Sequence, residues 1–374
     1  MISNSFKHLH IISFNVPYPP DYGGVIDVYH KIRWLSQAGV KIHLHAFTYN
    51  RPGDQELEKY CESVNYYARN TKINNHFSFL PYIVYSRKNN RLLKNLMANN
   101  YPILFEGLHT CYYLGNPLLK DRIKIVRTHN IEHKYYYKLS RSDRKKVHRI
   151  YHLIESIKLR YFERVLKYAD HILSISSIEN EYFQKRYNKT LLVPPFHLFE
   201  KIRSLPGKGK YILLHGNLAV PENIDAIKYL LPIIRNTTGY PVIIAGKEPV
   251  KDISKLAVTY INTRIITSPG IDEMYSLIMN SHLIILYTFQ STGTKLKLFD
   301  SLYLGRFIIA NSKMIEGSGI NDLCEIADTP EILGQKISQT LNLSFTDEMV
   351  EKRKLMLSGF SNKHNAEIIA LLLK

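Results

Sequence analysis

The sequence is poor in cysteine and has no long apolar run. Its 374 residues include three cysteines, Cys61, Cys111 and Cys324, which stand singly. Single cysteines exclude a disulfide scaffold and a cysteine-based zinc cluster, and they are typical of a reducing, cytoplasmic compartment. No apolar stretch approaches the roughly eighteen residues that a membrane span requires. Residues 1–16 are apolar only in short pieces and lack a small-residue cleavage site, so we expect a first strand there instead of a signal peptide.

Two nucleotide-binding patterns are absent as well. Neither the phosphate-loop pattern G-x-x-x-x-G-K nor the dinucleotide pattern G-x-G-x-x-G occurs. His129 and His133 have the His-x-x-x-His spacing of a metal-binding pair on a helix, but no third ligand is obvious. We therefore expect no metal site.

Positive charge, in contrast, is abundant and unevenly spread. The formal net charge is +18. Residues 1–195 carry 30 Lys and Arg against 15 Asp and Glu, an excess of +15, whereas residues 196–374 carry 20 against 17, an excess of +3. A split of this size indicates that the first half faces an anionic partner. Nucleic acid, an anionic membrane surface and an anionic substrate remain open on charge alone.

Short apolar strands alternate with helical segments along the chain. This rhythm predicts βαβ units and parallel sheets covered on both faces. The expected fold class is therefore α/β, with two Rossmann-like doubly wound domains that face each other across a cleft. Strands are expected at residues 8–15, 40–47, 102–107, 123–128, 171–175 and 190–193, and then at 211–215, 241–245, 263–267, 282–287 and 307–310.

A joint rich in proline, glycine and charge separates the two halves. Residues 1–195 are predicted to form the first domain, 196–208 the linker and 209–345 the second domain. The tail, residues 346–374, is helical in pattern and is expected to pack back on the first domain.

Ligands of open parallel sheets bind beyond the carboxyl ends of the strands, and two stretches of the first half lie there. Residues 17–24 end in Gly23 and Gly24 before a helix, so backbone N–H groups can approach an anion. Residues 129–133 begin with His129, which can hydrogen-bond a sugar hydroxyl or phosphate or transfer a proton. An ordinary strand–helix turn and a partly buried histidine are the plain alternatives.

The second half has two such stretches. Gly216 and Asn217 follow its first strand and offer a tight turn and an amide donor, although a plain turn would use the same residues. Residues 290–300 follow a strongly apolar strand and combine Ser, Thr and Gly with a helix that carries two lysines. Amides, hydroxyls and ammonium groups converging at a helix N-terminus favour a diphosphate site over a capped, solvated helix.

Residues 134–167 are basic and rich in aromatic side chains. They hold 11 Lys and Arg against three acidic residues. Such a segment favours an anionic membrane surface. A solvated helix face is the next alternative, and a nucleic acid is not expected, because no signature of a nucleic-acid-binding module is present.

Together these stretches resemble the GT-B glycosyltransferases, in particular glycosyltransferase family 4. Residues 17–24 are similar to that family's N-terminal Gly-Gly loop, and residues 128–130 are similar to its strand-end histidine. Residues 245–247 and 269–275 resemble loops of its second domain. Residues 293–302 resemble its phosphate- and ribose-binding helix.

The resemblance implies a hexosyltransferase that moves a sugar from a UDP- or GDP-linked donor to a glycan or lipid-linked acceptor in bacterial surface polysaccharide or glycoconjugate biosynthesis. It implies retention of configuration, no separate cofactor and, since no Asp-x-Asp occurs, no essential metal. The catalytic residues would be His129 and Lys295. The donor-binding residues would be Gly23, Gly24, Gly216, Asn217, Lys247, Gly270, Ile271, Ser291, Thr292, Gly293, Thr294, Lys297 and Asp300, and the acceptor-binding residues Asp21, Tyr22, Asn130 and Glu132.

Two positions depart from the family pattern. The family's two glutamates, eight residues apart, correspond here to Thr292 and Asp300. A GT-B-type sugar-nucleotide epimerase and a non-catalytic nucleotide-sugar-binding homologue are therefore the alternatives. Because the half with the larger positive charge would bind the acceptor, the charge split favours an anionic acceptor at the inner face of the cytoplasmic membrane.

Overall fold

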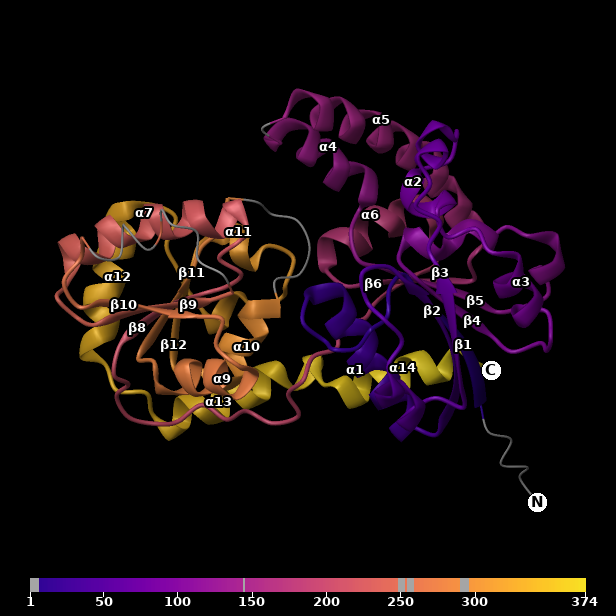
Figure 1. Ribbon diagram of the computed structural model, residues 1–374. Coiled ribbons are helices and arrows are strands. Elements are labelled where there is room, and N and C mark those ends of the chain that lie inside the picture. Colours follow the sequence, from indigo (N-terminus) through magenta and orange to yellow (C-terminus); the bar gives the residue numbers. More distant parts are fainter. Residues whose placement is uncertain (1–6, 144, 248–252, 254–258, 290–295) are drawn as a thin grey trace, which may run out of the picture. The chain divides into compact units, whose positions relative to one another are not determined.

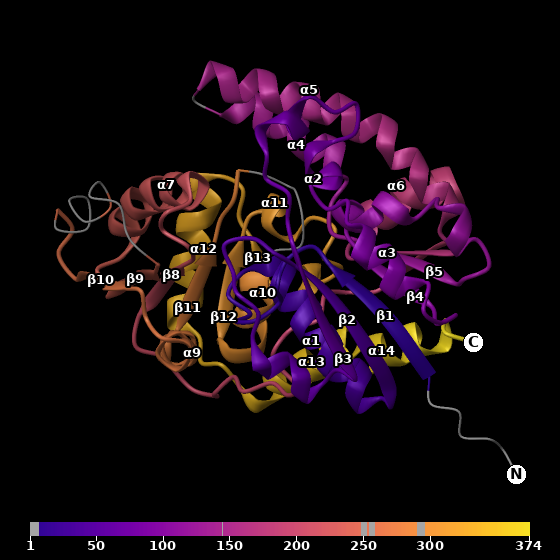
Figure 2. The same cartoon turned by 45° about the vertical axis from the view of Figure 1, so that its right-hand side comes forward.

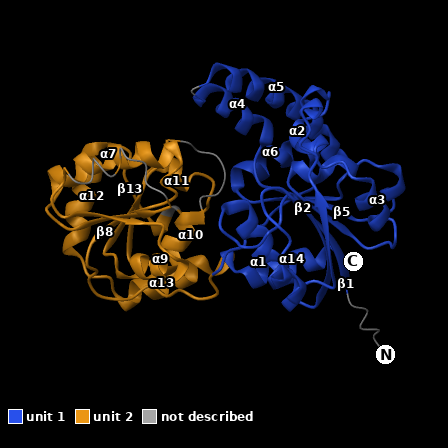
Figure 3. Cartoon of the chain, in the orientation of Figure 1, with its two compact units in different colours: residues 1–198, 292–294, 360–374 blue, residues 199–291, 295–359 orange. Residues whose placement is uncertain are grey.

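The computed structural model describes residues 7–143, 145–247, 253, 259–289 and 296–374 (Figure 1). The chain divides into two compact units (Figure 3). As far as they are described, residues 1–198 and 360–374 form unit 1, and residues 199–291 and 295–359 form unit 2. Each unit is built around its own parallel sheet.

The sheet of unit 1 has seven described strands in the order β3-β2-β1-β4-β5-β6-β7. β1 pairs with β2 on one side and with β4 on the other, so the strand order reverses between β1 and β4. The carboxyl edge at such a switch point is where ligands of this fold class bind. The strands are β1 (Lys7–Ser13), β2 (Val40–Thr48), β3 (Ser63–Ala68), β4 (Ile103–Glu106), β5 (Lys124–Thr128), β6 (His171–Ser174) and β7 (Thr190–Leu192).

The central strands of unit 1 are apolar on both faces. Every residue of β4 and β5 is buried, as expected where helices cover both faces of a parallel sheet. β3 is not among the predicted strands, because it is polar and has one buried residue, which is typical of a sheet edge.

The first and last helices of unit 1 pack against each other. Val28 and Ile32 of α1 share a core cluster with Ala366 and Ile369 of α14 and with residues of β1 and β2. The last helix of the chain is therefore part of unit 1. The helices of this unit are α1 (Gly23–Gln37), α2 (Tyr82–Tyr85), α3 (Asn90–Leu96), α4 (Glu132–Ser142), α5 (Lys146–Phe162), α6 (Ser177–Tyr187) and α14 (Asn362–Leu371).

Unit 2 repeats this design with six described strands in the order β10-β9-β8-β11-β12-β13. The two Rossmann-like parallel sheets that the sequence predicts are thus confirmed. The strands are β8 (Ile212–His215), β9 (Val242–Gly246), β10 (Thr263–Thr267), β11 (Leu283–Leu286), β12 (Phe307–Ala310) and β13 (Glu325–Ile326), and the helices are α7 (Pro221–Thr237), α9 (Ile271–Asn280), α10 (Leu296–Leu304), α11 (Ser312–Ile315), α12 (Pro330–Asn342) and α13 (Asp347–Leu357).

A chain of buried and partly buried hydrogen bonds links β1, β2 and β3. His10 contacts the Asn99 oxygen through Nε2 at 2.8 Å, so Nε2 carries the proton and Nδ1 accepts from His45 Nε2 at 2.9 Å. His45 Nδ1 then accepts from the Tyr67 hydroxyl at 2.8 Å, and this hydroxyl accepts from the Asn95 amide at 2.8 Å. The directions are consistent only if both imidazoles are neutral.

Burial keeps these histidines neutral. It lowers the pKa of His10 to about 4 and that of His45 to about 3, with the neighbouring histidines contributing further. In the unfolded chain histidine titrates near 6.5, so between that pH and about 4 the unfolded state binds more protons than the folded state. Stability is therefore highest above this range and is lost as the pH falls.

We predict that the free energy of unfolding falls by about 1–2 kcal/mol for each of these two histidines between about pH 7.5 and pH 5. His45→Phe removes one of the proton-binding groups. Between the same two pH values, the free energy of unfolding of this variant will therefore fall by about 1–2 kcal/mol less than that of the wild type. Urea unfolding at both pH values measures the difference, with the exposed His364→Gln as the control. A His45→Phe variant whose stability follows the wild-type pH dependence would contradict the prediction.

Candidate functional site

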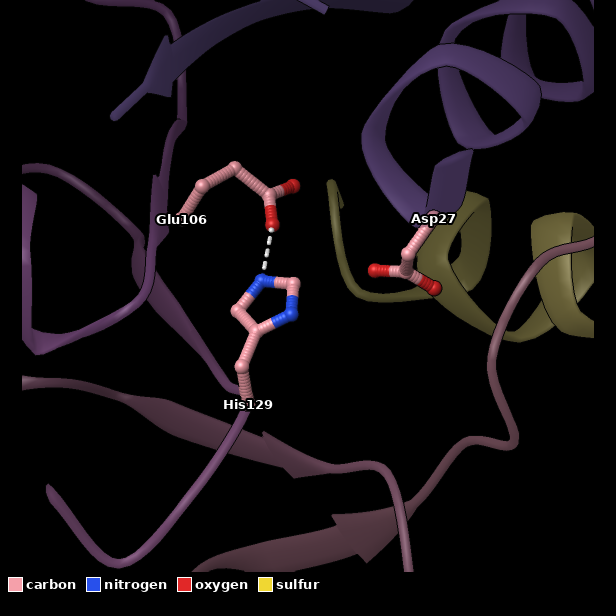
Figure 4. A group of neighbouring side chains, drawn as sticks. All are labelled: Asp27, Glu106 and His129. Atoms are coloured by element: carbon pink, nitrogen blue, oxygen red, sulfur yellow. Dashed lines mark hydrogen bonds and ion pairs between the residues drawn. The ribbon is translucent and has the colours of Figure 1, made fainter. Parts of the chain in front are cut away.

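The candidate site of unit 1 lies at the carboxyl edge of its sheet, between β4 and β5. Glu106 is the last residue of β4, and His129 directly follows β5. His129 Nε2 donates a hydrogen bond to Glu106 Oε2 at 3.0 Å (Figure 4). The carboxylate of Asp27, from α1, lies on the side of the second ring nitrogen (Figure 4). Two carboxylates therefore flank the histidine.

Two cations neutralise these carboxylates. Lys31 Nζ lies 2.8 Å from Asp27 Oδ2 and 2.7 Å from Glu106 Oε1. Arg127 donates to both oxygens of Asp27, at 3.0 and 3.3 Å. These four side chains, which we call the charge cluster, are at most 3% exposed. Because a buried charge is stable only when it is paired and hydrogen-bonded, the four side chains depend on one another.

The charge cluster also fixes the chain that follows β7. Arg127 donates to the carbonyl oxygens of Val193 and Pro194, and the backbone N–H of Phe196 donates to Asp27 Oδ1 at 2.7 Å. One carboxylate thus connects α1, β5 and the segment that leaves the sheet.

The charges in the cluster control its protonation. Burial raises the pKa of Asp27, but the neighbouring Arg127 and Lys31 lower it by more than burial raises it. The pKa of Asp27 is therefore well below its usual range. The same balance holds for Glu106, where burial is outweighed by Lys31 and by the hydrogen bond from His129. Both carboxylates are therefore ionised at neutral pH.

Asp27, Glu106 and His129 also meet the distance requirement for a metal site, since their ligand atoms lie within 4.8 Å of one another. Their chemistry does not fit one. Lys31 and Arg127 already occupy the carboxylate oxygens, and a divalent cation would have to displace them. The arrangement is that of a neutralised ion-pair network, so we derive no metal chemistry from it.

Aromatic and glycine residues surround His129. The Phe14 ring packs edge-on against the histidine with centroids 5.5 Å apart. Gly24, in the first turn of α1, lies against the same ring, since a Cβ there would be 2.7 Å from a Phe14 carbon. Gly23 begins that helix. His129 is 13% exposed, so a ligand at this edge can reach it.

A second polar pair lies near His129. Glu132, in the first turn of α4, is 3% exposed, and its Oε1 lies 3.9 Å from Nδ1 of His109. Neither atom has a hydrogen-bond partner among the described residues. Burial raises the pKa of Glu132 to about 8, against a smaller opposing effect of its hydrogen bond with Asn130, and burial lowers the pKa of His109 well below its usual value. At neutral pH the carboxyl is therefore protonated and the imidazole is neutral.

The other two predicted acceptor residues, in the loop before α1, already have partners. Asp21 pairs with Arg51 at 2.6 Å, and the Tyr22 hydroxyl accepts from the Asn15 amide at 3.1 Å. Both side chains are largely exposed, Asp21 at 54% and Tyr22 at 44%.

In unit 2 the predicted residues after β8 and β9 lie side by side. A Cβ on Gly246 would lie 1.8 Å from the carbonyl oxygen of Gly216, so only glycine allows the two segments to approach this closely. The carbonyl of Lys247 accepts from the loop after β8 at 3.1 Å. Asn217 uses its side-chain oxygen in its own turn, accepting at 3.0 Å from the N–H two residues on.

The helix α10 carries polar side chains toward the same edge. Lys297 Nζ donates to Asn223 Oδ1 at 3.2 Å. His215 Nε2 donates to Ser301 Oγ at 2.9 Å, because that hydroxyl itself donates to the Lys297 carbonyl. Burial and the charge of Lys297 lower the pKa of His215 to about 3. Burial raises the pKa of Asp300 to about 7, so its carboxyl titrates near neutral pH.

Further predicted donor residues are Gly270, which precedes the first residue of α9, and Ile271, which is 59% exposed. Five more predicted positions lie outside the described residues: Ser291, Thr292, Gly293, Thr294 and Lys295.

Sequence reasoning missed the charge cluster itself. One signal was available, since Glu106 is a carboxylate at the end of a predicted apolar strand. Asp27 and Lys31 were a second signal, because they stand four residues apart among the apolar positions of a predicted helix. His109 gave no signal, because it lies in a short 3-10 helix after β4 that the sequence pattern does not predict.

No known family profile matches this chain. A Klebsiella pneumoniae protein described as an uncharacterized 44.6 kDa protein in the cps region is 27% identical over 330 residues, which are 83% of this chain and 84% of the relative. Among solved structures, sucrose-phosphate synthase from Thermosynechococcus elongatus superposes with a TM-score of 0.66 at 14% identity over 98% of both chains.

Two further structures agree with this match. TarM superposes with a TM-score of 0.68 at 10% identity over the full length of both chains. MurG from Acinetobacter baumannii gives 0.54 at 14% identity over 98% of this chain and 99% of its own. These enzymes share the GT-B architecture, and this chain has the same fold. The predicted GT-B resemblance is thus confirmed at the level of the fold, whereas membership of family 4 stays a prediction.

We predict that Lys31→Met lowers the free energy of unfolding by about 3–5 kcal/mol, because it removes the cation that neutralises the buried carboxylate of Glu106. Lys41→Met is the matched control, since Lys41 and Glu62 form an exposed pair. The control should change stability by about 0–1 kcal/mol. Urea unfolding of both variants measures the contrast, and equal losses would contradict the role assigned to the charge cluster.

Proposed function

We propose that this protein is a glycosyltransferase that moves a hexose-type sugar from a UDP- or GDP-linked donor to a glycan or lipid-linked acceptor. The observation that carries the proposal is the likeness to glycosyltransferase structures over nearly the whole chain, with a polar site at the switch point of unit 1. A structure of an S. aureus TarM variant in complex with UDP and α-GlcNAc-glycerol, at a TM-score of 0.62, supports a nucleotide-sugar and a glycan acceptor. The relative in a cps region supports surface polysaccharide biosynthesis as the process.

The donor is assigned to unit 2. Two features favour an anionic ligand there. The segments after β8 and β9 pack closely because glycine permits it, and Lys297 places its amino group at the start of α10. In the proposed mechanism, Lys297 and Lys295 stabilise the charge that develops on the departing diphosphate, which is where electrostatic stabilisation lowers a barrier most. The carboxyl of Asp300 titrates near pH 7, so it suits hydrogen bonds with ribose hydroxyls.

His129 is assigned to the transferred sugar. Because its Nε2 hydrogen bonds to Glu106, the orientation of the ring is set before any ligand binds. The charge cluster holds Glu106 ionised, and an ionised acceptor makes the stronger hydrogen bond. The proposal includes retention of configuration and no metal in the reaction.

A screen of UDP- and GDP-sugars with glycan acceptors tests the function. We predict sugar transfer by the wild type, and a decrease of kcat/KM on the order of 10²-fold in His129→Ala and in Lys297→Met, because each loses a contact to the transition state. Lys313→Met, at an exposed position of unit 2, is the control.

Three other outcomes of the screen would reject the proposal. Release of a free epimer without acceptor would indicate an epimerase. Donor binding without turnover would indicate a non-catalytic binding protein. Lack of binding to UDP, GDP and their sugars would contradict the assignment of unit 2.

The acceptor is assigned to unit 1, with Glu132 and His109 as a hydroxyl-binding pair. Their atoms at 3.9 Å are too far apart to bond each other, and both are buried without a partner among the described residues. We infer that one ligand oxygen, at about 2.8 Å from each, bonds both after the side chains that cover them move aside. The protonated carboxyl donates to that oxygen and the neutral imidazole accepts from it. A sugar hydroxyl supplies both functions.

We predict that Glu132→Leu raises KM for the acceptor about tenfold and leaves KM for the donor unchanged, because one hydrogen bond in a desolvated site is lost. Glu132→Gln retains a donor and should stay within a few fold of the wild type. As the pH rises through about 8, wild-type Glu132 ionises and acceptor affinity falls, whereas the Gln variant does not follow. An unchanged acceptor KM in the Leu variant would contradict the pair.

A membrane location completes the proposal. The excess of positive charge in residues 134–167 supports transfer at the anionic inner face of the cytoplasmic membrane. In the part of the chain that the structure describes, no helix is long and apolar enough to cross a bilayer.

A further inference from the structure

An apolar stripe runs along the outer face of α5. Val147, Ile150, Ile154, Ile157 and Tyr161 follow one another at intervals of three and four residues, the spacing of one helix face. Their exposed fractions are 76, 61, 47, 52 and 64%. The opposite face of α5 is buried against unit 1, so the orientation of the stripe toward solvent is fixed by packing.

A second group of exposed apolar side chains lies beside α5. Ile73, Phe77 and Phe79 are 76, 83 and 99% exposed. Lys158 of α5 donates to the carbonyl of His76 at 3.0 Å, which holds this segment against the helix. Figure 2 shows α4 and α5 as a hairpin with the segment before α2 beside it.

Positive charge borders these apolar side chains. A groove of about 510 Å³ between α4 and α5 is lined by Arg141, Lys146 and Arg149 together with Tyr137, Ile150 and Leu153. All three of these cations are exposed. A groove of this composition fits a phosphate group attached to a hydrocarbon chain.

Exposed apolar side chains bordered by positive charge favour one kind of binding partner for this surface. A monomeric protein rarely leaves so many large apolar side chains exposed together unless they bind something. A second copy would bring the same positive charge, and the +15 excess of residues 1–195 opposes that association. A bilayer with anionic phospholipids offers both apolar chains and negative phosphates.

We propose that the α5 stripe and the Ile73, Phe77 and Phe79 group insert into the interface of an anionic bilayer, with a lipid phosphate in the groove between α4 and α5. The insertion combines apolar burial with electrostatic attraction, the two contributions that stable attachment requires. This extends the charge-based membrane location to named apolar side chains, of which Ile73, Phe77 and Phe79 lie outside residues 134–167. Binding to vesicles needs no turnover, so the proposal can fail or hold independently of the transferase assignment.

Co-sedimentation of the full-length protein with vesicles tests the proposal. One set of vesicles is phosphatidylcholine alone, and the other contains about a third phosphatidylglycerol. We expect at least about tenfold tighter binding to the second set, and a decrease of that binding with added salt. Equal binding to both sets would overturn the proposal.

Two variants separate the apolar and the charged contributions. Phe77→Ser combined with Phe79→Ser removes apolar contacts, and Arg141→Gln, Lys146→Gln and Arg149→Gln together remove cations of the groove. Each set changes exposed positions and should weaken vesicle binding about tenfold or more, and the charge variant should also lose most of the salt dependence. Leu355→Ser, at a 76% exposed position of α13 in unit 2, is the control and should bind as the wild type does.

Three results would reject the bilayer as occupant. The first is unchanged vesicle binding in both variants. The second is a dimer of the wild type that Val147→Ser and Ile154→Ser dissociate in sedimentation, which would assign the stripe to a second copy. The third is competition by millimolar inorganic phosphate that abolishes vesicle binding, which would assign the groove to a free anion.

Discussion

The site of unit 1 depends on the buried charge cluster of Asp27, Lys31, Glu106 and Arg127. Each of these charges would be costly to bury alone, and each is neutralised by the others. The cluster joins α1 to β4 and β5 and, through the Phe196 N–H, to the segment that leaves β7. Because Glu106 is held on one side by Lys31, its other oxygen accepts the hydrogen bond from His129 Nε2 in one geometry.

The sequence predicts the two parallel sheets because apolar strands such as 241–245 and 282–287 can be recognised from their own residues alone. It predicts His129 and Glu132 as candidates because ligands gather at strand ends. It offers signals for single members of the charge cluster but not for their meeting, since Asp27 and Arg127 are a hundred residues apart in the chain and come together only through the sheet. The Glu132–His109 pair is unpredictable for the same reason, because burial and missing partners are properties of the folded state.

The basic residues of the first half fall into two groups in the folded unit 1. Lys31 and Arg127 are buried and compensated by Asp27 and Glu106, so this group adds nothing to the excess. A second group is exposed on α4 and α5, where Arg141, Lys146 and Arg149 line a groove beside apolar side chains. The buried charges organise a strand edge, and the exposed charges define a surface suited to lipid. The charge cluster therefore contributes nothing to the +15 excess, and the exposed cations are the ones that indicate an anionic partner.

The central claim is that the charge cluster orients His129 for sugar transfer. Steady-state kinetics of Glu106→Gln test it most directly, because the amide keeps the size of the side chain and removes the charge that holds the imidazole. Circular dichroism and urea unfolding first establish that the variant is folded. The account predicts a decrease of kcat on the order of tenfold or more with little change in KM for the donor. A folded variant with wild-type kcat would contradict it.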